Sequence, residues 1–210
     1  RLSSMDLREK LTPAILSYDG IAYQYMAPTV FETEMLSYVQ EHLRILSGFY
    51  GIVRPMDGVT PYRLEMQAKL EIDGAKNLYE YWGDRLYKEV RDSSGIIINL
   101  ASKEYSKCIE KYLQPGDRYI SCNFYEEQEG KLVQKGVYCK MARGEMVRFM
   151  AENRVEEPEG IKDFAVMGYR YAKELSSEKE YIFVRIKGAV KKRPTKRPIN
   201  LASANLSVFF

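Results

Sequence analysis

The chain has 210 residues, of which 45% are apolar and 12% aromatic, so it can bury a core of its own and is not an intrinsically disordered protein. Its formal net charge is +3, but six lysines and arginines and no acid lie in residues 187–210, which leaves residues 1–186 at −3. A protein that is basic over its whole surface is excluded, and any contact with nucleic acid has to come from a local patch.

The N-terminal part of the chain carries turn signals followed by a helix signal. Residues 1–30 contain prolines, a glycine and several tyrosines, which predict a strand and a turn. Apolar residues then recur at helical spacing, with Thr33 available as N-cap and Gly48 as the stop. This pattern predicts a helix over residues 34–47.

Two further elements are predicted before the middle of the chain. Apolar and charged residues alternate over residues 62–66, which predicts a strand with Arg63 and Glu65 on one face. Asn77 can cap a helix whose apolar stripe ends before Ser93.

The central part of the chain predicts a buried strand and a hairpin. The continuous apolar run at residues 96–98 is typical of a strand covered on both sides. Ser102 can cap a helix that extends to residue 113. Two strand-like runs, residues 118–127 and 131–138, are joined by a polar turn that contains a glycine, so they are predicted to pair as a hairpin.

The last ordered elements are predicted to be a long helix, a short one and a hairpin. The long helix covers residues 140–154, and a helical turn follows at residues 161–164. The hairpin has arms at residues 168–173 and 181–186. Together these elements predict an α+β fold, a single domain with a mixed β-sheet surrounded by helices.

The domain is predicted to cover residues 1–186. Residues 187–210 combine prolines and cations with an end that has no apolar periodicity. They are predicted to be a basic tail that is disordered or vector-derived.

Cysteine usage and hydropathy predict a cytoplasmic protein. Cys108, Cys122 and Cys139 are far apart and form no C-x-x-C motif, so a disulfide framework is not expected. No apolar run is long enough to span a membrane, and no membrane partner is predicted.

The helix predicted at residues 140–154 has one cationic side. At about 100° per residue, Lys140 and Arg143 fall on the same side, with Arg148 on the flank. Such a face can bind phosphate, and it can equally be a solvated helix surface.

A second group of candidate phosphate contacts lies nearer the N-terminus. Gly48 and Gly51 flank a turn whose backbone N–H groups can approach phosphate, as in helix-hairpin-helix elements, although Gly48 can also be a simple helix stop. Internal pairing with Asp57 and Glu65 is the alternative role for the nearby arginines. Three guanidinium groups there have the geometry to hold phosphate oxygens: Arg44, Arg54 and Arg63.

Catalytic groups are few. The single histidine, His42, lies at the edge of an apolar helix face, which favours packing over metal binding. H-x-x-H, P-loop and G-x-S-x-G motifs are absent, so the corresponding hydrolase classes find no support. Glu104 and Glu65 are the weak acid/base candidates. Ser102 lies beside Glu104, but a role as helix N-cap alone is enough to explain it. No metal site and no cofactor are predicted.

Seven blocks of the sequence resemble one known family, in its order and spacing. They are HLR at 42–44, LSGFYG at 46–51, RPMD at 54–57, PYRLEM at 61–66, LYEYWG at 78–83, IINLASKEY at 97–105 and KMARGEMVRF at 140–149. The chain is similar to the YaaA family of bacterial peroxide stress proteins over residues 11–185. The resemblance implies a cytoplasmic protein that takes part in resistance to hydrogen peroxide, control of free iron and binding to double-stranded DNA. Family members begin with a strand that contains a SPAKT-like motif, which is absent here, so the chain is expected to be truncated at its N-terminus.

Two hypotheses follow. The first is a protein of the oxidative stress response that binds double-stranded DNA through phosphates in a local basic cleft, without sequence specificity, and so limits damage by peroxide and free iron. Its expected contacts are Lys140, Arg143, Arg148, Arg54, Arg63, Arg44, Gly48 and Gly51. The alternative is an enzyme that acts on a nucleotide, nucleobase or nucleic acid, in which Arg54 and Arg63 hold phosphate and Glu104 or Glu65 acts as acid/base.

Overall fold

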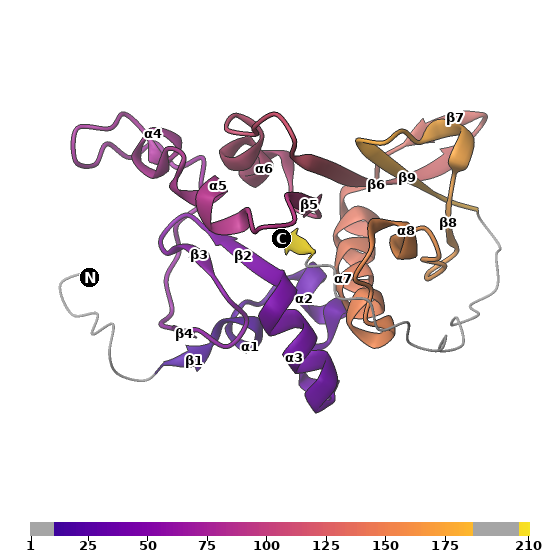
Figure 1. Cartoon of the computed structure of the whole chain (residues 1–210), viewed down its shortest axis with the longest axis horizontal. Coiled ribbons are helices and arrows are strands. Elements are labelled where there is room, and N and C mark those ends of the chain that lie inside the picture. The colour runs from indigo at the N-terminus through magenta and orange to yellow at the C-terminus, as the bar shows by residue number, and fades with distance from the viewer. Residues whose placement is uncertain (1–10, 187–205) are drawn as a thin grey trace.

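One mixed sheet organises the protein, whose computed structural model describes residues 11–186 and 206–210 (Figure 1). The strand order is β3-β2-β10-β5-β6-β9-β8, and β7 pairs with β6. β2, β10, β5, β6 and β9 are parallel to one another, while β3, β7 and β8 are antiparallel to their neighbours. The strands are β2 (Leu43–Ser47), β3 (Gly51–Val53), β5 (Ile96–Asn99), β6 (Arg118–Gln128), β7 (Lys131–Val133), β8 (Tyr169–Tyr171), β9 (Glu180–Arg185) and β10 (Ser207–Phe209). The predicted class, a single α+β domain with a mixed sheet, is confirmed.

Helices cover both faces of the sheet, and β1 (Thr12–Pro13) pairs with β4 (Gly58–Val59) beside it (Figure 1). Alternate residues of β5 show the two layers, because Ile98 belongs to the larger apolar cluster, with α2, α3, α7 and α8, and Ile97 to the smaller one, with α4, α5 and α6. The helices are α1 (Ala14–Ser17), α2 (Ile21–Met26), η2 (Pro28–Val30), α3 (Thr33–His42), α4 (Leu78–Trp82), α5 (Arg85–Val90), α6 (Lys103–Glu110), α7 (Gly136–Asn153), α8 (Pro158–Ile161) and η3 (Lys173–Leu175).

Several predicted elements are confirmed. The apolar run at residues 96–98 forms β5, which is paired on both edges and covered on both faces. α6 begins directly after Ser102, and β8 pairs antiparallel with β9 as the predicted hairpin requires.

The helix predicted over residues 34–47 is wrong in its second half. α3 begins at Thr33 and ends at His42, and Leu43–Ser47 form β2, in which every residue is buried. Apolar side chains spaced for a helix also suit a strand that is covered on both faces, so the pattern did not distinguish the two. Gly48 therefore follows a strand and does not stop a helix.

Other boundaries also differ from the predictions. Residues 11–30 are mostly helical, with only the short β1 as a strand, and residues 62–66 form no regular strand. The helix predicted after Asn77 is two helices, because Gly83 between them has φ +55°. α7 begins at Gly136, which shortens the strand predicted for residues 131–138.

The segment predicted to be a disordered or vector-derived tail is ordered at its end. Residues 187–205 lie outside the described part of the chain, but Ser207–Phe209 form β10 in the middle of the sheet. β10 is parallel to both β2 and β5, and its residues are buried. The C-terminal residues are thus part of the core.

The structure contains no helix, within its described residues, that is both long and apolar enough to cross a lipid bilayer.

Asp117 joins α5 to the start of β6 through a buried carboxylate, whose side chain is 1% exposed. It accepts hydrogen bonds from the Tyr87 hydroxyl (2.6 Å), the Arg91 Nε (2.8 Å) and the Gln114 backbone N–H (2.8 Å). Burial acts to raise the pKa of Asp117, but the hydrogen bonds from Tyr87, Gln114 and Arg91 outweigh it, so the pKa is lowered. The charged carboxylate is therefore the form that the fold stabilises.

Replacement of Asp117 by Asn is expected to reduce the free energy of unfolding at pH 7 by about 2 kcal/mol, because a charged acceptor with three donors is lost. A lowered folded-state pKa means that this stabilisation is present above the unfolded pKa of about 3.9 and is lost as pH falls through the folded value. Urea unfolding at pH 7 and pH 3 checks this, since the difference in free energy of unfolding between parent and variant should be smaller at pH 3. An equal difference in free energy of unfolding at both pH values would contradict the stabilising role given to the charged Asp117 carboxylate.

Candidate functional site

Two cations on one side of α7 have no acidic partner in the part of the chain that the structure describes. Arg143 is half-buried, and its Nε is buried without a hydrogen-bond partner. Burial lowers the pKa of Arg143, and the nearby Cys139 acts in the opposite direction. Lys140, one turn earlier, is exposed, and neither cation has an acidic partner among the described residues. Residues three apart on a helix are neighbours, so α7 presents both cations together.

Arg148, the third predicted cation of this helix, is engaged within it. Its Nε lies 2.8 Å from a Glu152 carboxylate oxygen, four residues along α7. Its charge is already balanced, so Arg148 offers less to an incoming phosphate than Arg143 and Lys140 do.

Arg44 on β2 is a structural residue. It is 8% exposed, and its guanidinium donates to the Glu41 and Leu43 carbonyl oxygens at 2.7 and 3.1 Å. Burial lowers the pKa of Arg44, and the positive charge of Arg54 lowers it further. A duplex cannot reach this group without rearrangement of the strand, so Arg44 is removed from the candidate phosphate contacts.

Arg54 and Arg63 are exposed and have no acidic side-chain partner in the part of the chain that the structure describes. The predicted pairing of Arg54 with Asp57 involves its backbone N–H, which donates to the Asp57 carboxylate at 2.7 Å, and leaves the guanidinium unpaired. Arg54 follows Val53, which pairs with Ile45, so it lies toward the amino end of β2. Arg63 is in the segment beyond β4.

Gly48 and Gly51 lie at the other end of β2, in the β2–β3 hairpin, and packing explains both. A Cβ at Gly48 would lie 2.7 Å from the Leu64 carbonyl oxygen, and the Gly48 carbonyl accepts a hydrogen bond from Trp82 Nε1 at 3.1 Å. Gly51 has φ +78°, and a Cβ there would lie 2.7 Å from the Trp82 ring. Because this turn lies at the carboxyl end of β2 and Arg44 and Arg54 lie toward its amino end, the residues predicted as phosphate contacts do not form one continuous group.

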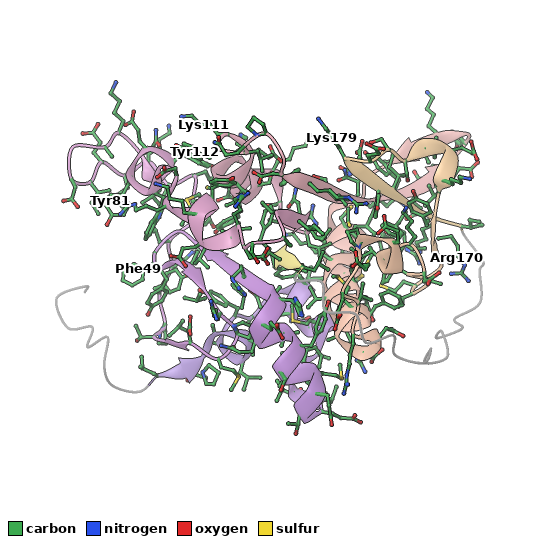
Figure 2. All side chains as sticks on the ribbon, viewed as in Figure 1. Phe49, Tyr81, Lys111, Tyr112, Arg170 and Lys179 are labelled. Carbon is green, nitrogen blue, oxygen red and sulfur yellow. The ribbon has the colours of Figure 1, made fainter. Side chains whose placement is uncertain are left out.

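A cluster of tyrosines at the carboxyl end of β2 was not predicted. The Tyr62 hydroxyl lies 2.5 Å from Ser47 Oγ and 2.8 Å from the Tyr18 hydroxyl. Phe49 stacks on Tyr62 at 5.2 Å between ring centroids, and Tyr23 stacks on Tyr18 at 5.5 Å. Figure 2 shows Phe49 at the periphery of the molecule, beside the β2–β3 turn. These residues come from three separate segments with no common spacing, so only the high tyrosine content of the chain could have pointed to them.

The acid/base candidates lie near this cluster. The Glu104 carboxylate accepts the Gln67 backbone N–H at 3.2 Å, and Glu65 is exposed. Burial, and then the charge of Glu104, raise the pKa of Tyr105 to about 12, and Tyr62 and Glu65 add to the shift. The two carboxylates are thus close to one protonated phenol. The enzyme hypothesis stays a prediction.

His42 is packed, as the sequence favoured. Its Nδ1 lies 2.7 Å from the Leu206 carbonyl oxygen, and its ring lies against Tyr38 at 4.4 Å. Within residues 11–186 and 206–210, no three histidine, cysteine, aspartate or glutamate side chains are grouped so that they could hold a metal ion.

Comparison with known proteins finds one matching family profile and several similar bacterial proteins. The sequence profile of a family described as "Peroxide stress protein YaaA" matches residues 1–175. A UPF0246 protein of Agathobacter rectalis is 66% identical over 185 residues, which are 88% of this chain and 74% of that protein. UPF0246 proteins of Desulfitobacterium hafniense and Lachnoclostridium phytofermentans are 56% and 53% identical over 88% and 92% of this chain, and 74% and 76% of their own lengths.

Proposed function

Because the chain belongs to the peroxide stress protein YaaA family, we propose that it acts in the peroxide stress response by binding duplex DNA without sequence specificity. In this proposal, cations on α7 contact backbone phosphates, and the bound protein limits damage to the duplex by peroxide and free iron. Phosphate contacts fix the position of a protein on DNA but carry no sequence information, which suits a general protective role.

Arg143 carries the proposal. A buried polar group without a hydrogen-bond partner is rare in folded proteins and needs an explanation, and Arg143 Nε is such a group. A guanidinium matches a phosphate well, because it can donate two parallel charge-assisted hydrogen bonds. Because this Nε is buried, a phosphate oxygen reaches it only when the Arg143 side chain moves outward, and it then supplies the acceptor that the described residues do not.

The charge distribution supports a local contact. Residues 1–186 carry a formal charge of −3, so attraction to DNA has to come from particular cations. Lys140 extends the contact of Arg143 along the helix. Arg54 and Arg63 are exposed and unpaired within the described residues and remain proposed contacts elsewhere on the surface.

Replacement of Arg143 by Met is expected to weaken duplex binding about tenfold, to a similar extent for unrelated sequences, because one charged phosphate contact is lost. Met preserves the packing of the long side chain while removing its charge and donors. Fluorescence anisotropy with two labelled duplexes of different sequence measures the effect.

The matched control is Arg170→Met on β8. Arg170 is an exposed arginine whose side chain projects away from the body of the protein at the outer edge of the sheet (Figure 2). Its replacement should leave duplex affinity within about twofold of the parent. Equal loss in both variants would reduce the proposal to general charge attraction, and no loss in Arg143→Met would refute it.

A further inference from the structure

An open pocket of about 400 Å³ lies between the β1–β4 pair and the tyrosines, and the DNA proposal does not use it. It is formed by segments on both sides of α1 and by the chain that follows β4. Among the residues that the structure describes, no charged side chain lines it. The lining residues are Thr12, Leu16, Ser17, Tyr18, Val59, Thr60, Pro61 and Tyr62. A cavity of this size holds a small molecule with one or two rings.

The hydrogen bonds behind the pocket wall have a fixed direction. Ser47 Oγ accepts the backbone N–H groups of Phe49 at 3.1 Å and Tyr50 at 2.9 Å. A serine hydroxyl has two acceptor lone pairs and one hydrogen, so Ser47 has to donate that hydrogen to Tyr62. Tyr62 then donates to Tyr18, at 2.8 Å.

This series of three hydroxyls, Ser47–Tyr62–Tyr18, ends in a donor for which the described residues supply no acceptor. The three hydroxyl groups carry three hydrogens, and two of these form the hydrogen bonds between them. The Tyr18 hydrogen is therefore left for an acceptor other than these three hydroxyls. Burial, followed by the hydrogen bond and charge of Tyr62, raises the pKa of Tyr18, so this donor is retained at neutral pH. Stacking on Tyr23 holds the ring in place.

The other walls define what the pocket can accept. Ser17 Oγ donates to the Pro13 carbonyl at 3.0 Å, which leaves its lone pairs as acceptors for a ligand. Leu16, Val59 and Pro61 provide apolar contact, and the Tyr18 and Tyr62 rings provide aromatic contact. Over its described lining, the site therefore combines the directed Tyr18 donor, other hydroxyl groups, apolar surface and no formal charge. These features match a neutral planar heterocycle that carries both acceptor and donor atoms.

We propose that the tyrosine pocket binds the base of a nucleoside, with the Tyr18 hydroxyl donating to a carbonyl or ring-nitrogen acceptor of that base. Aromatic side chains and hydroxyls are the usual partners of unpaired bases, because stacking and edge hydrogen bonds together replace the contacts made in water. This binding is separate from the phosphate contacts proposed for α7.

Isothermal titration calorimetry with adenosine, guanosine, cytidine and uridine, and with ribose alone, tests the proposal. At least one nucleoside should bind with a Kd below about 1 mM, and ribose should not bind. Tyr18→Phe keeps the ring and removes the donor, and it should weaken that binding about tenfold. The matched control is Tyr112→Phe, a tyrosine just after α6 in the other apolar cluster (Figure 2), which should leave the Kd unchanged.

A second variant does not depend on the interior hydrogen bonds. Leu16 is 48% exposed at the pocket, so Leu16→Trp should obstruct it without disturbing the core, and should abolish nucleoside binding. Duplex affinity should be unchanged in Tyr18→Phe and Leu16→Trp, which separates this site from the proposed DNA contacts. The proposal is overturned if no nucleoside binds, if ribose binds as well as the nucleosides do, or if Tyr18→Phe binds like the parent.

Discussion

Removal of residues 206–210 is expected to abolish the folded state. β10 lies between β2 and β5 and forms backbone hydrogen bonds along both edges, so its loss splits the sheet into two parts. Phe209 and Leu206 are fully buried, and the loss of one large core side chain alone costs about 3–5 kcal/mol. The loss of a whole central strand exceeds the net stability of about 5–15 kcal/mol that a domain has. Circular dichroism and urea unfolding of the shortened chain measure the effect.

The matched control is a single substitution in the same strand. Ser207 Oγ donates to Asp92 at 2.9 Å, so Ser207→Ala removes one hydrogen bond and is expected to cost about 1 kcal/mol while the strand remains. Cooperative unfolding of the shortened chain at the urea midpoint of the parent would show that β10 does not hold the sheet together.

Substitution of Gly144 by Ala is expected to destabilise the protein by about 3 kcal/mol or more, at the upper end of the usual cost of overpacking. A Cβ at this position of α7 would lie 1.9 Å from the Ala22 carbonyl oxygen and 2.8 Å from the Met26 nitrogen, both in α2. These are backbone atoms and cannot rotate away, so the two helices would have to separate (Figure 1). Thermal and urea unfolding measure the change.

Gly136→Ala is the control on the same helix. It lies at the first residue of α7, and nothing is within 4 Å of the position that its Cβ would take. Ala there should be neutral or slightly stabilising, because it restricts the unfolded chain. If the two substitutions have equal effects, the close approach of α2 and α7 does not explain the glycine at 144.

The sequence predicts those parts of the fold whose signal is local. Three consecutive isoleucines identify β5, because a strand covered on both faces needs an apolar residue at every position. β2 was missed, since Leu43 and Leu46 fit the spacing of the preceding helix equally well. β10 was missed because its partners are far away in the sequence and three residues carry no detectable period.

In the candidate site too, features with a local sequence signal could be predicted, and features that depend on distant contacts could not. The cations of α7 could be found from helical spacing, and the pairing of Arg148 with Glu152 follows from their separation by four residues. Burial of Arg44 could not be predicted, because it depends on the strand that was taken for a helix. The series of hydroxyls from Ser47 to Tyr18 depends on tertiary contacts between the end of β2 and two other segments, which no local pattern encodes.

The dependence of duplex affinity on salt tests the central claim most directly. Each phosphate contact releases bound cations from DNA, so the logarithm of the association constant should fall linearly with the logarithm of the salt concentration. With two to four contacts from α7 and the exposed arginines, the expected slope is about −2 to −4 for the parent, and it should be shallower by about 1 in Arg143→Met. An affinity that does not change with salt, or a slope that is the same in both proteins, would contradict the claim that Arg143 holds a DNA phosphate.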